Sequence, residues 1–477
     1  MHRQPEAMWA VWACATALIG FNLAQHAVWL DEAQAWCLVR DSVSWTEWRW
    51  NMRDEGHPWL WYALLFPLAK GGLPVWSMQA LHGVIASTTV AVVLFRAPFP
   101  LLVRVAVVFG HFFVFEFAAL SRNYALGGLL LLVAAGMDRR SPWRTVMLVL
   151  LAQTHLWGTL VALTWIAADV WEQRRASWML RHAIPVLASC ALALACALPA
   201  EPLPYGPDPA RLLDPDHRAR LLRLLTAVAV PWPDPGAAHV WGSSLPWRAP
   251  VWIAESLGLA ALLSSIVLLP ANGPGRWRFA ACTCAVLALP LVAPFHAIRY
   301  AGPLVYVAVA LAWKDGAIGV PAPPWRTARK ALVAALLLVQ MTGGILASRH
   351  FAQRPFSLAA ATVDRVRTDG LAELPFIVDR LALAPAVSAS LGRPVLLATD
   401  GHARSFVRWH PATPDASPAQ LLDLAERFAR PGVHVLSRAP IDPSACAARG
   451  LHLVVLGTCT GGEIRAEDGV LQRITTR

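Results

Sequence analysis

The stretch LDEAQAWCLVRDSVSWTEWRWNMRDEGHPWLWY, residues 30–62, separates two strongly apolar segments and differs from both. It carries adjacent carboxylates at Asp31 and Glu32, and a further acid, Glu55, two residues before His57. It is also rich in tryptophan, a residue that favours membrane–water interfaces. Ionisable groups at membrane depth are costly, so they usually face a cavity or a partner. The stretch therefore predicts a polar site built next to a bilayer.

The composition of the chain also indicates a membrane protein. Of the 477 residues, 56% are apolar and 15% are charged, and the mean hydropathy is +0.47. A soluble domain is about 25% charged. The net charge of +11 would suit a nucleic-acid-binding protein. The basic residues lie mostly in short loops between apolar runs, however, and no basic cluster is interleaved with aromatic residues, which argues against nucleic acid.

The apolar runs predict a polytopic α-helical membrane protein. A transmembrane helix needs about 20 mostly apolar residues. On this criterion we expect about eleven spans, with residues 64–73 as a partial addition. The first run is too long for a cleavable signal peptide, and no small-residue cleavage site precedes Trp29. The expected spans cover residues 8–29, 74–95, 101–120, 123–137, 143–155, 157–172, 178–199, 250–270, 278–295, 300–316 and 327–348.

The basic residues predict the orientation of these spans. With the N-terminus inside, every inner loop carries Arg or Lys, as the positive-inside rule requires. The arginines of the outer segment 201–249 count for less, because long translocated loops report orientation poorly. We therefore expect a cytoplasmic N-terminus and an extracytoplasmic C-terminus. The inner loops are then 96–104, 138–144, 174–181, 276–278 and 314–330, and we interpret the arginines of 139–144 and the basic run 326–330 as topogenic.

This orientation brings ionisable and aromatic residues from several segments to the outer ends of the spans. The set contains acids, histidines, arginines and tyrosines, which is the composition of a binding or catalytic site rather than of a lipid-facing surface. Its members are Asp31, Glu32, Glu55, His57, Glu116, Arg122, Tyr124, His155, His296, Arg299 and Tyr300.

The chain changes character after residue 349. Short β-rich runs at 375–378, 395–399, 433–437 and 451–456 alternate with helical stretches at 380–391 and 418–428, which predicts an α/β domain. We expect a transmembrane domain over 1–349, with outer segments 30–73 and 201–249, and an extracytoplasmic domain over 350–477. Cys446 and Cys459 share that domain, where an oxidising compartment would allow a disulfide. The cysteines and histidines do not have the spacing typical of a zinc site, so they do not indicate a metal.

Three motifs resemble those of a known family. Asp31-Glu32 just after the first span, followed in the same loop by His57-Pro58, is similar to the GT-C fold glycosyltransferases, which include protein O-mannosyltransferases and lipid A aminoarabinose transferases. SRNYAL (121–126) resembles their Arg-x-Tyr segment, and HAIRYAGP (296–303) resembles their late Arg-Tyr segment. The resemblance covers roughly residues 8–350. It departs at Trp59, where many members have a second proline.

The resemblance implies sugar transfer from a polyprenyl-phosphate carrier to a glycan, lipid or protein acceptor at the outer face of a bacterial inner (plasma) membrane. It implies Asp31 as the general base with Glu32 orienting it, and no cofactor is required, although some relatives use a divalent metal. Negative charge develops on the lipid phosphate as it departs, and cations are needed to stabilise it, as they stabilise other developing anions. The residues expected to bind the lipid phosphate or the substrate are His57, Arg122, Tyr124, Arg299, Tyr300 and Glu55.

Structural roles compete with these functional ones. Asp31 would also serve as the N-cap, and Glu32 as a first-turn acid, of a helix over 31–40. Ser44 to Glu47 form a capping box, which predicts a short interfacial helix in which Glu47 is structural. His155 beside a helix turn is more often a satisfied polar residue than a ligand.

Two other classes of function compete with the transferase. A lipid-linked saccharide transporter or flippase would predict internal repeats and charges on both sides of the membrane. A non-catalytic membrane scaffold would not need Asp31, Arg122 and Arg299 together.

Overall fold

The computed structural model describes residues 4–173, 175–198, 206–237, 240–268, 273–294, 296–314, 326–409 and 414–476. The chain forms two compact units. The first contains residues 1–23, 56–61 and 80–350, and the second contains 24–55, 62–79 and 351–477. Residues 24–55 and 62–79 therefore pack with the C-terminal segment, whereas we expected a boundary at residues 349 and 350.

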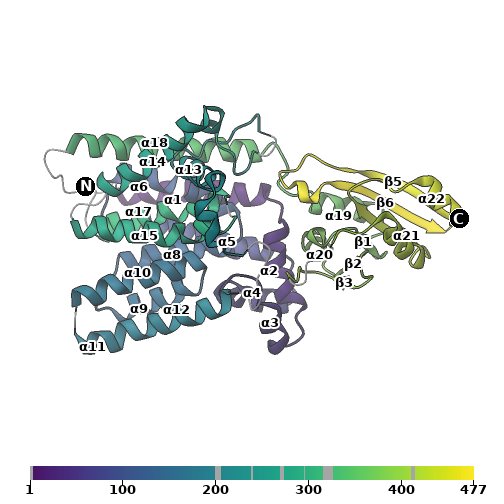
Figure 1. Cartoon of the computed structure of the whole chain (residues 1–477), viewed down its shortest axis with the longest axis horizontal. Coiled ribbons are helices and arrows are strands. Elements are labelled where there is room, and N and C mark those ends of the chain that lie inside the picture. The colour runs from purple at the N-terminus through teal and green to yellow at the C-terminus, as the bar shows by residue number, and fades with distance from the viewer. Residues whose placement is uncertain are drawn as a thin grey trace. The chain divides into compact units, whose positions relative to one another are not determined.

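The first unit is helical, and its helices follow the expected apolar runs (Figure 1). The last residues of the runs 178–199, 250–270, 278–295 and 300–316 lie outside the described residues. The helices that build this part of the chain are α1 (Gln4–Gln25), α5 (Trp76–Arg96), α6 (Leu101–Val108), α7 (Phe117–Ala119), α8 (Asn123–Ala135), α9 (Pro142–Ala152), α10 (Leu156–Gln173), α11 (Ala176–Trp178), α12 (Ile184–Ala197), α13 (Pro215–Ala229), α14 (Val251–Leu268), α15 (Gly273–Val292), α16 (Ile298–Ala301), α17 (Pro303–Lys314) and α18 (Arg326–Phe351), with short π segments at Phe112–Glu116 (η1) and Met179–Ala183 (η2) and 3-10 turns at Pro209–Leu213 (η3) and Leu245–Arg248 (η4).

Helix length and composition indicate a membrane protein. They establish fewer than the eleven spans that we expected. Among the described residues, five helices are long and apolar enough to cross a bilayer, and the number rises to six if one bent pair counts as a span. Several other apolar helices, such as α8 and α9, have 10–17 residues. The helical membrane class is therefore confirmed, and eleven spans stay a prediction.

The expected span 101–120 is broken. Helix α6 ends at Val108, and the chain continues as η1 and α7 after a bend of 54°. The five residues of η1 form a π-helix, a geometry that is frequent at functional sites. Gly110 lies in the break, where an added Cβ would come within 3.0 Å of the Val107 carbonyl oxygen. The break carries Glu116 to the end of η1, with only 1% of its surface exposed.

Helix α8 packs closely on two neighbours because it lacks side chains at two consecutive positions. A Cβ on Gly127 would lie 2.6 Å from the Trp157 ring of α10, and one on Gly128 would lie 2.8 Å from the Tyr306 ring of α17. Glycine thus lets two aromatic rings reach the α8 backbone. Figure 1 shows α8, α9, α10 and α12 side by side in this unit. The close packing fixes the first turn of α8, which follows Arg122.

A buried ion cluster joins residues of α9, α10, α17 and the loop before α9. Asp169 of α10 is fully buried and lies 2.5 Å from Arg144 and 3.3 Å from Lys314. Arg139 is 3.8 Å from Asp169 and also pairs with Glu172. Arg144 has 2% of its surface exposed. Our interpretation of the arginines of 139–144 as topogenic was therefore incomplete, because Arg144 is a buried partner of Asp169.

The second unit contains a six-stranded mixed sheet in the order β3-β2-β1-β4-β6-β5. β1 pairs in parallel with β2 and β4, and the remaining pairs are antiparallel. The expected strands near 375, 395, 433 and 451 are confirmed, whereas β3 and β6 were not expected. The strands are β1 (Phe376–Val378), β2 (Val395–Leu397), β3 (Ala403–Arg404), β4 (Val433–Ser437), β5 (Leu451–Cys459) and β6 (Gly469–Thr476), and the helices around them are α19 (Ala359–Thr368), α20 (Ala384–Leu391), α21 (Pro418–Arg427) and α22 (Pro443–Ala448), with 3-10 turns η5 (Leu381–Leu383) and η6 (Arg465–Glu467).

The core of this sheet follows from its sequence pattern. Ile377, Val435 and Ile474 from three neighbouring strands are fully buried, and α21 covers them with Leu421 and Leu424. Parallel strands buried on both faces favour continuous apolar runs; β1 has one, whereas β4 also buries His434 and Ser437.

The two cysteines of this domain, Cys446 and Cys459, do not form a disulfide with each other. Cys446 lies in the core on α22, and Cys459 accepts a hydrogen bond from the Thr362 hydroxyl at 3.1 Å. Both are free thiols, so the disulfide that we considered is not formed.

The segment between α1 and α5 contains helices α2 (Leu30–Asp41), α3 (Trp45–Asn51) and α4 (Leu60–Lys70). α2 packs on α20, where Arg40 donates hydrogen bonds to the backbone oxygen and hydroxyl of Ser388. The Ser44 hydroxyl accepts the Glu47 amide at 3.1 Å and so caps α3, as expected. Trp48 is 1% exposed, so only part of α3 offers aromatic surface to an interface.

The orientation of the chain is tested by reporter fusions after residues 140 and 360. We expect a cytoplasmic signal at 140 and an extracytoplasmic signal at 360, because basic inner loops are retained on the inner side. The measurement compares a reporter active only in the cytoplasm with one active only outside. The same side for both fusions would contradict an outer location of the C-terminal domain.

Candidate functional site

The turn between α9 and α10, residues 153–155, is the scaffold of a polar cluster in the helical unit. The Gln153 carbonyl accepts the Leu60 amide at 3.1 Å, and the Thr154 carbonyl accepts the Asn123 side-chain amide at 2.7 Å. Gln153 is itself tied to α12, since its side chain donates to both oxygens of Ser189. Leu60 follows the His57-Pro58 motif, and Asn123 follows Arg122. One turn therefore gathers two motif segments that are distant in the sequence.

Arg122 and His57 form the centre of this cluster. Arg122 Nη2 lies 2.7 Å from His57 Nε2. A guanidinium can only donate, so Nε2 is the acceptor and the imidazole proton lies on Nδ1. Burial lowers the pKa of His57 well below its usual range, and the neighbouring Arg122, His155 and Arg299 lower it further. His57 is therefore neutral near pH 7, which contradicts the positive charge that we expected for it.

His155 completes a pair of imidazoles. Its ring lies 4.8 Å from the His57 ring and 4.7 Å from the Tyr124 ring. Its Nδ1 accepts the Trp157 amide at 3.3 Å, which caps the start of α10 and leaves the proton on Nε2. Burial, with Arg122 and Arg299 nearby, lowers the pKa of His155 to about 3. The capping half of this residue is satisfied, as the structural interpretation predicts.

The two protonated ring nitrogens lack acceptors within the described part of the chain. His57 Nδ1 and His155 Nε2 are both buried, and neither has a hydrogen-bond partner there. A buried donor without an acceptor costs about 1–3 kcal/mol. An oxygen-bearing anion in contact with both imidazoles would remove this cost.

Arg299 contributes a second guanidinium from the turn before α17. It is close enough to His57 and His155 to lower the pKa of both. Its guanidinium carbon lies 4.9 Å from the centre of the Trp241 ring and 5.1 Å from that of Tyr300. The structure thus brings together Arg122, Arg299 and His57, three of the expected phosphate ligands, and places Tyr300 against one of them.

His296 lies in the same late motif, beside a histidine that we did not single out. His217 Nε2 contacts the carbonyl oxygens of Pro290 and Leu291 at 3.0 Å, so it donates and Nδ1 is an acceptor. That Nδ1 lies 3.2 Å from His296 Nε2, which then carries the proton. Burial, followed by His217, Arg220 and Arg211, lowers the pKa of His296 to about 4.

Asp31 and Glu32 lie in the second unit, in the first turn of α2. The N-cap of α2 is Trp29, so the expectation that Asp31 is the cap was wrong. Glu32 is fully buried, and its Oε2 lies 2.7 Å from His26 Nε2 and accepts the Trp29 amide at 3.3 Å. These contacts favour an anchoring role for Glu32. Asp31 is half-buried, one residue nearer the helix start.

Glu55 is a structural hub of the same unit. Its Oε1 accepts from Gln34 at 2.7 Å and from the Trp409 indole at 3.1 Å, and its Oε2 accepts from the Tyr62 hydroxyl at 3.0 Å. Gln34 also exchanges two hydrogen bonds with the Val407 backbone. Glu55 therefore joins α2, α4 and the segment after β3, and these contacts favour a positioning role over substrate binding.

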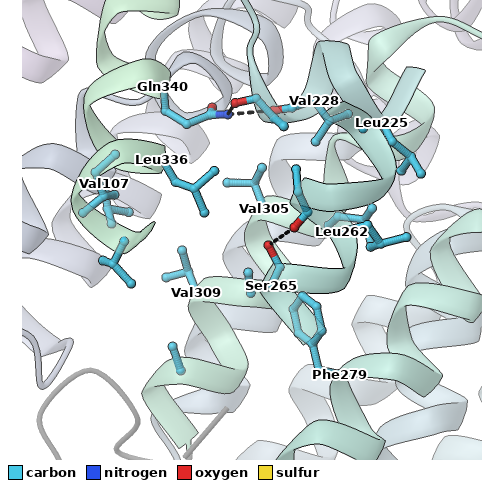
Figure 2. Close-up of a pocket in the computed structure, with 18 of the residues that line it drawn as sticks. Val107, Leu225, Val228, Leu262, Ser265, Phe279, Val305, Val309, Leu336 and Gln340 are labelled. Atoms are coloured by element: carbon cyan, nitrogen blue, oxygen red, sulfur yellow. Dashed lines mark hydrogen bonds between the residues drawn. The ribbon is translucent and has the colours of Figure 1, made fainter. Parts of the chain in front are cut away.

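An apolar cavity of about 160 Å³ lies among the helices of the first unit (Figure 2). Its lining comes from α6, α13, α14, α15, α17 and α18, and Gln340 at one border donates to the Val228 carbonyl at 2.7 Å. An apolar cavity of roughly 150 Å³ stays dry and binds hydrocarbon. Along α17 the lining runs from Leu304 to Ala312, about 12 Å of helix. Leu304 is five residues beyond Arg299, so this cavity follows the helix that begins next to the cationic cluster.

Within the described residues, no group of three histidine, cysteine, aspartate or glutamate side chains lies close enough to hold a metal ion. No protein-family model matches the chain, and neither does any curated protein sequence.

The fold does match solved structures of ArnT from Cupriavidus metallidurans. The structure bound to undecaprenyl phosphate superposes with a TM-score of 0.53 at 11% identity, over 99% of this chain and 98% of that one. The apo structure gives a TM-score of 0.44 at 12% identity, over 98% of each chain. At such identity the first match shows a shared fold and no more. The GT-C fold of ArnT is the fold that the sequence motifs predicted.

Proposed function

We propose that this protein transfers a sugar from a polyprenyl-phosphate carrier to an acceptor at the outer face of the membrane. The observation that carries the proposal is the cluster of Arg122, Arg299, His57 and His155, in which two guanidiniums lie beside two imidazole N–H donors that lack acceptors among the described residues. Such a set is suited to a phosphate group, since Arg presents a fork of donors that matches phosphate oxygens.

The neutral histidines strengthen this proposal. A protonated His57 would repel Arg122, whereas the neutral ring accepts from Arg122 and offers Nδ1–H to a further oxygen. The cluster therefore supplies positive charge from the arginines and neutral donors from the histidines. This arrangement stabilises the charge that develops on a departing phosphate without burying four cations together.

The apolar cavity gives the carrier a place for part of its chain. Along α17 its lining begins at Leu304, about one turn beyond the Arg299 segment. An isoprenoid attached to a phosphate at Arg299 would therefore extend along α17. A cavity of this size accommodates about one benzene-sized group. We therefore propose that it holds the first isoprene units and that the bilayer solvates the rest. The ArnT structure that shares this fold binds undecaprenyl phosphate.

The reaction needs a base and a leaving group. In the proposed step the acceptor oxygen attacks the anomeric carbon, the bond from that carbon to the phosphate oxygen breaks, and its electron pair leaves with the lipid phosphate. Asp31 takes the proton of the acceptor hydroxyl, and Arg122 and Arg299 stabilise the phosphate. No nucleotide cofactor takes part. A flippase would bind the lipid phosphate without needing this base.

Lysine substitutions at the two arginines test the proposal. Arg122→Lys and Arg299→Lys keep the charge and remove the fork, so each should raise the Kd for undecaprenyl phosphate, by about 10-fold if one charge-assisted hydrogen bond is lost. The measurement is a titration of purified full-length protein with undecaprenyl phosphate, and undecaprenol serves as the phosphate-free control. Arg104→Lys, in a segment away from the cluster, should leave the Kd unchanged. Wild-type affinity in both cluster variants would remove these arginines from the site.

A further inference from the structure

The connection between α13 and α14 is a loop held by three tryptophans. Residues 231–248 are described except for 238 and 239. The Trp232 indole donates to the Val339 carbonyl at 3.0 Å, and the Trp247 indole donates to the Arg223 carbonyl at 2.9 Å. The third indole, that of Trp241, donates to Glu116 Oε2 at 3.1 Å. The third contact differs from the others because its acceptor is a carboxylate.

The base of the loop is closed independently of Trp241. Arg248 Nε donates to Asp234 Oδ2 at 3.0 Å, and a second guanidinium nitrogen contacts Asp234 Oδ1. The Leu245 amide donates to the Trp232 carbonyl at 2.8 Å. The base of the loop is therefore closed by contacts other than the Glu116 bond, and that bond holds the Nε1 edge of the Trp241 ring.

The face of the Trp241 ring contacts the Arg299 guanidinium. The guanidinium carbon of Arg299 lies 4.9 Å from the ring centre, a cation–π distance. The same indole is held at its edge by Glu116, which is 1% exposed and ends the π segment η1. A carboxylate that accepts a hydrogen bond from the indole N–H polarises the ring, which strengthens the attraction of the ring for a cation. Three residues from η1, the loop and the turn before α17 thus form one chain of contacts.

We propose that Trp241 and Glu116 are positioning residues for Arg299. Glu116 fixes the edge of the indole, and the indole face holds the guanidinium over it, so that the guanidinium donors are presented to the carrier phosphate. This role rests on the proposed function, because it requires Arg299 to bind that phosphate. The proposed role also gives a function to the break in the expected span 101–120, because the π segment places the buried Glu116 carboxylate next to the loop.

Substitutions at Trp241 separate an aromatic role from simple packing. Trp241→Leu removes the π face, and its Kd for undecaprenyl phosphate should rise about 2- to 30-fold, the range of a cation–π contact. Trp241→Phe retains a ring and should lose clearly less than the Leu variant. Glu116→Gln keeps an acceptor oxygen and loses the charge, so its Kd should rise by less than that of Trp241→Leu. Binding of undecaprenol, which lacks the phosphate, should be the same in all variants.

The matched control is Trp232→Phe, which removes an indole N–H bond from the same loop but not from the contacts of Arg299. Its Kd for undecaprenyl phosphate should stay at the wild-type value. Equal losses in the Leu and Phe variants at position 241, or a loss in Trp232→Phe as large as that in Trp241→Leu, would overturn the proposed role. Absence of binding by the wild-type chain would instead overturn the proposed function, so the two failures are distinguishable.

Discussion

Replacing Asp31 by Asn should lower the rate of sugar transfer by about 100- to 10,000-fold, the usual cost of removing a general base. The substitution conserves shape, and Asp31 is not the cap of α2, since Trp29 occupies that position. A first-turn acid contributes about 0.3–1 kcal/mol to its helix. Folding should therefore change little while transfer falls steeply. The measurement is the release of polyprenyl phosphate from lipid-linked sugar donors of the source cells by purified protein.

Glu47→Gln is the matched control for Asp31→Asn. Glu47 is also a first-turn acid of a short helix in the first outer loop, and its Oε2 accepts the Val43 amide at 2.8 Å. The amide oxygen of Gln retains that acceptor, so transfer should stay within about twofold of wild type. Full transfer activity in a well-folded Asp31→Asn protein would show that Asp31 has a structural role and that another group takes the acceptor proton.

Removing the Asp169 carboxylate should cause the largest loss of stability. Asp169 is fully buried and contacts Arg144, Lys314 and Arg139, so Asp169→Ala leaves buried cations without their common partner. Loss of one member of a buried ion pair costs about 3–5 kcal/mol. The midpoint of thermal unfolding in detergent should fall accordingly, and the expression level should fall with it.

Two further variants isolate the charge from the loss of side-chain volume. Asp138→Ala removes an exposed acid of the neighbouring loop and should change stability by about 0.5 kcal/mol or less. The double substitution Asp169→Leu with Arg144→Met replaces the shortest pair by apolar groups and should recover part of the loss, because well-packed apolar residues can replace a buried pair. Equal unfolding midpoints for Asp169→Ala and wild type would show that the cluster is solvated and adds no stability.

The membrane class and the helical elements could be predicted from the sequence, because long apolar runs and basic loops are local patterns. The α/β character of residues 350–477 followed in the same way from short β-rich runs between helical stretches. The strands β3 and β6 were missed. β3 has two residues, and β6 carries polar residues such as Gln472 and Arg473 that weaken its apolar pattern. These strands depend on pairing with β2 and β4, which no local pattern records.

The motifs also predicted residues of the candidate site, and Arg122, His57 and Arg299 do gather in one unit. Their ionisation and their partners could not be predicted. His57 is neutral because it is buried and because Arg122 donates to it, and the Trp241 ring contacts both Glu116 of the π segment and Arg299. Both facts depend on atoms that are distant in the sequence.

What the sequence alone determined is the set of residues that cannot be left in lipid: acids, histidines and arginines at the ends of apolar runs. Transfer free energy depends on residue type and on the length of the run, so it can be evaluated along the chain. The tertiary structure decided which of these residues meet, since hydrogen bonds and cation–π contacts require distances of a few ångströms that arise only after helices pack. It placed His57 and Arg122 in one unit and Asp31 and Glu55 in the other. It also showed that Arg144, which the sequence places among the loop charges, is a buried partner of Asp169.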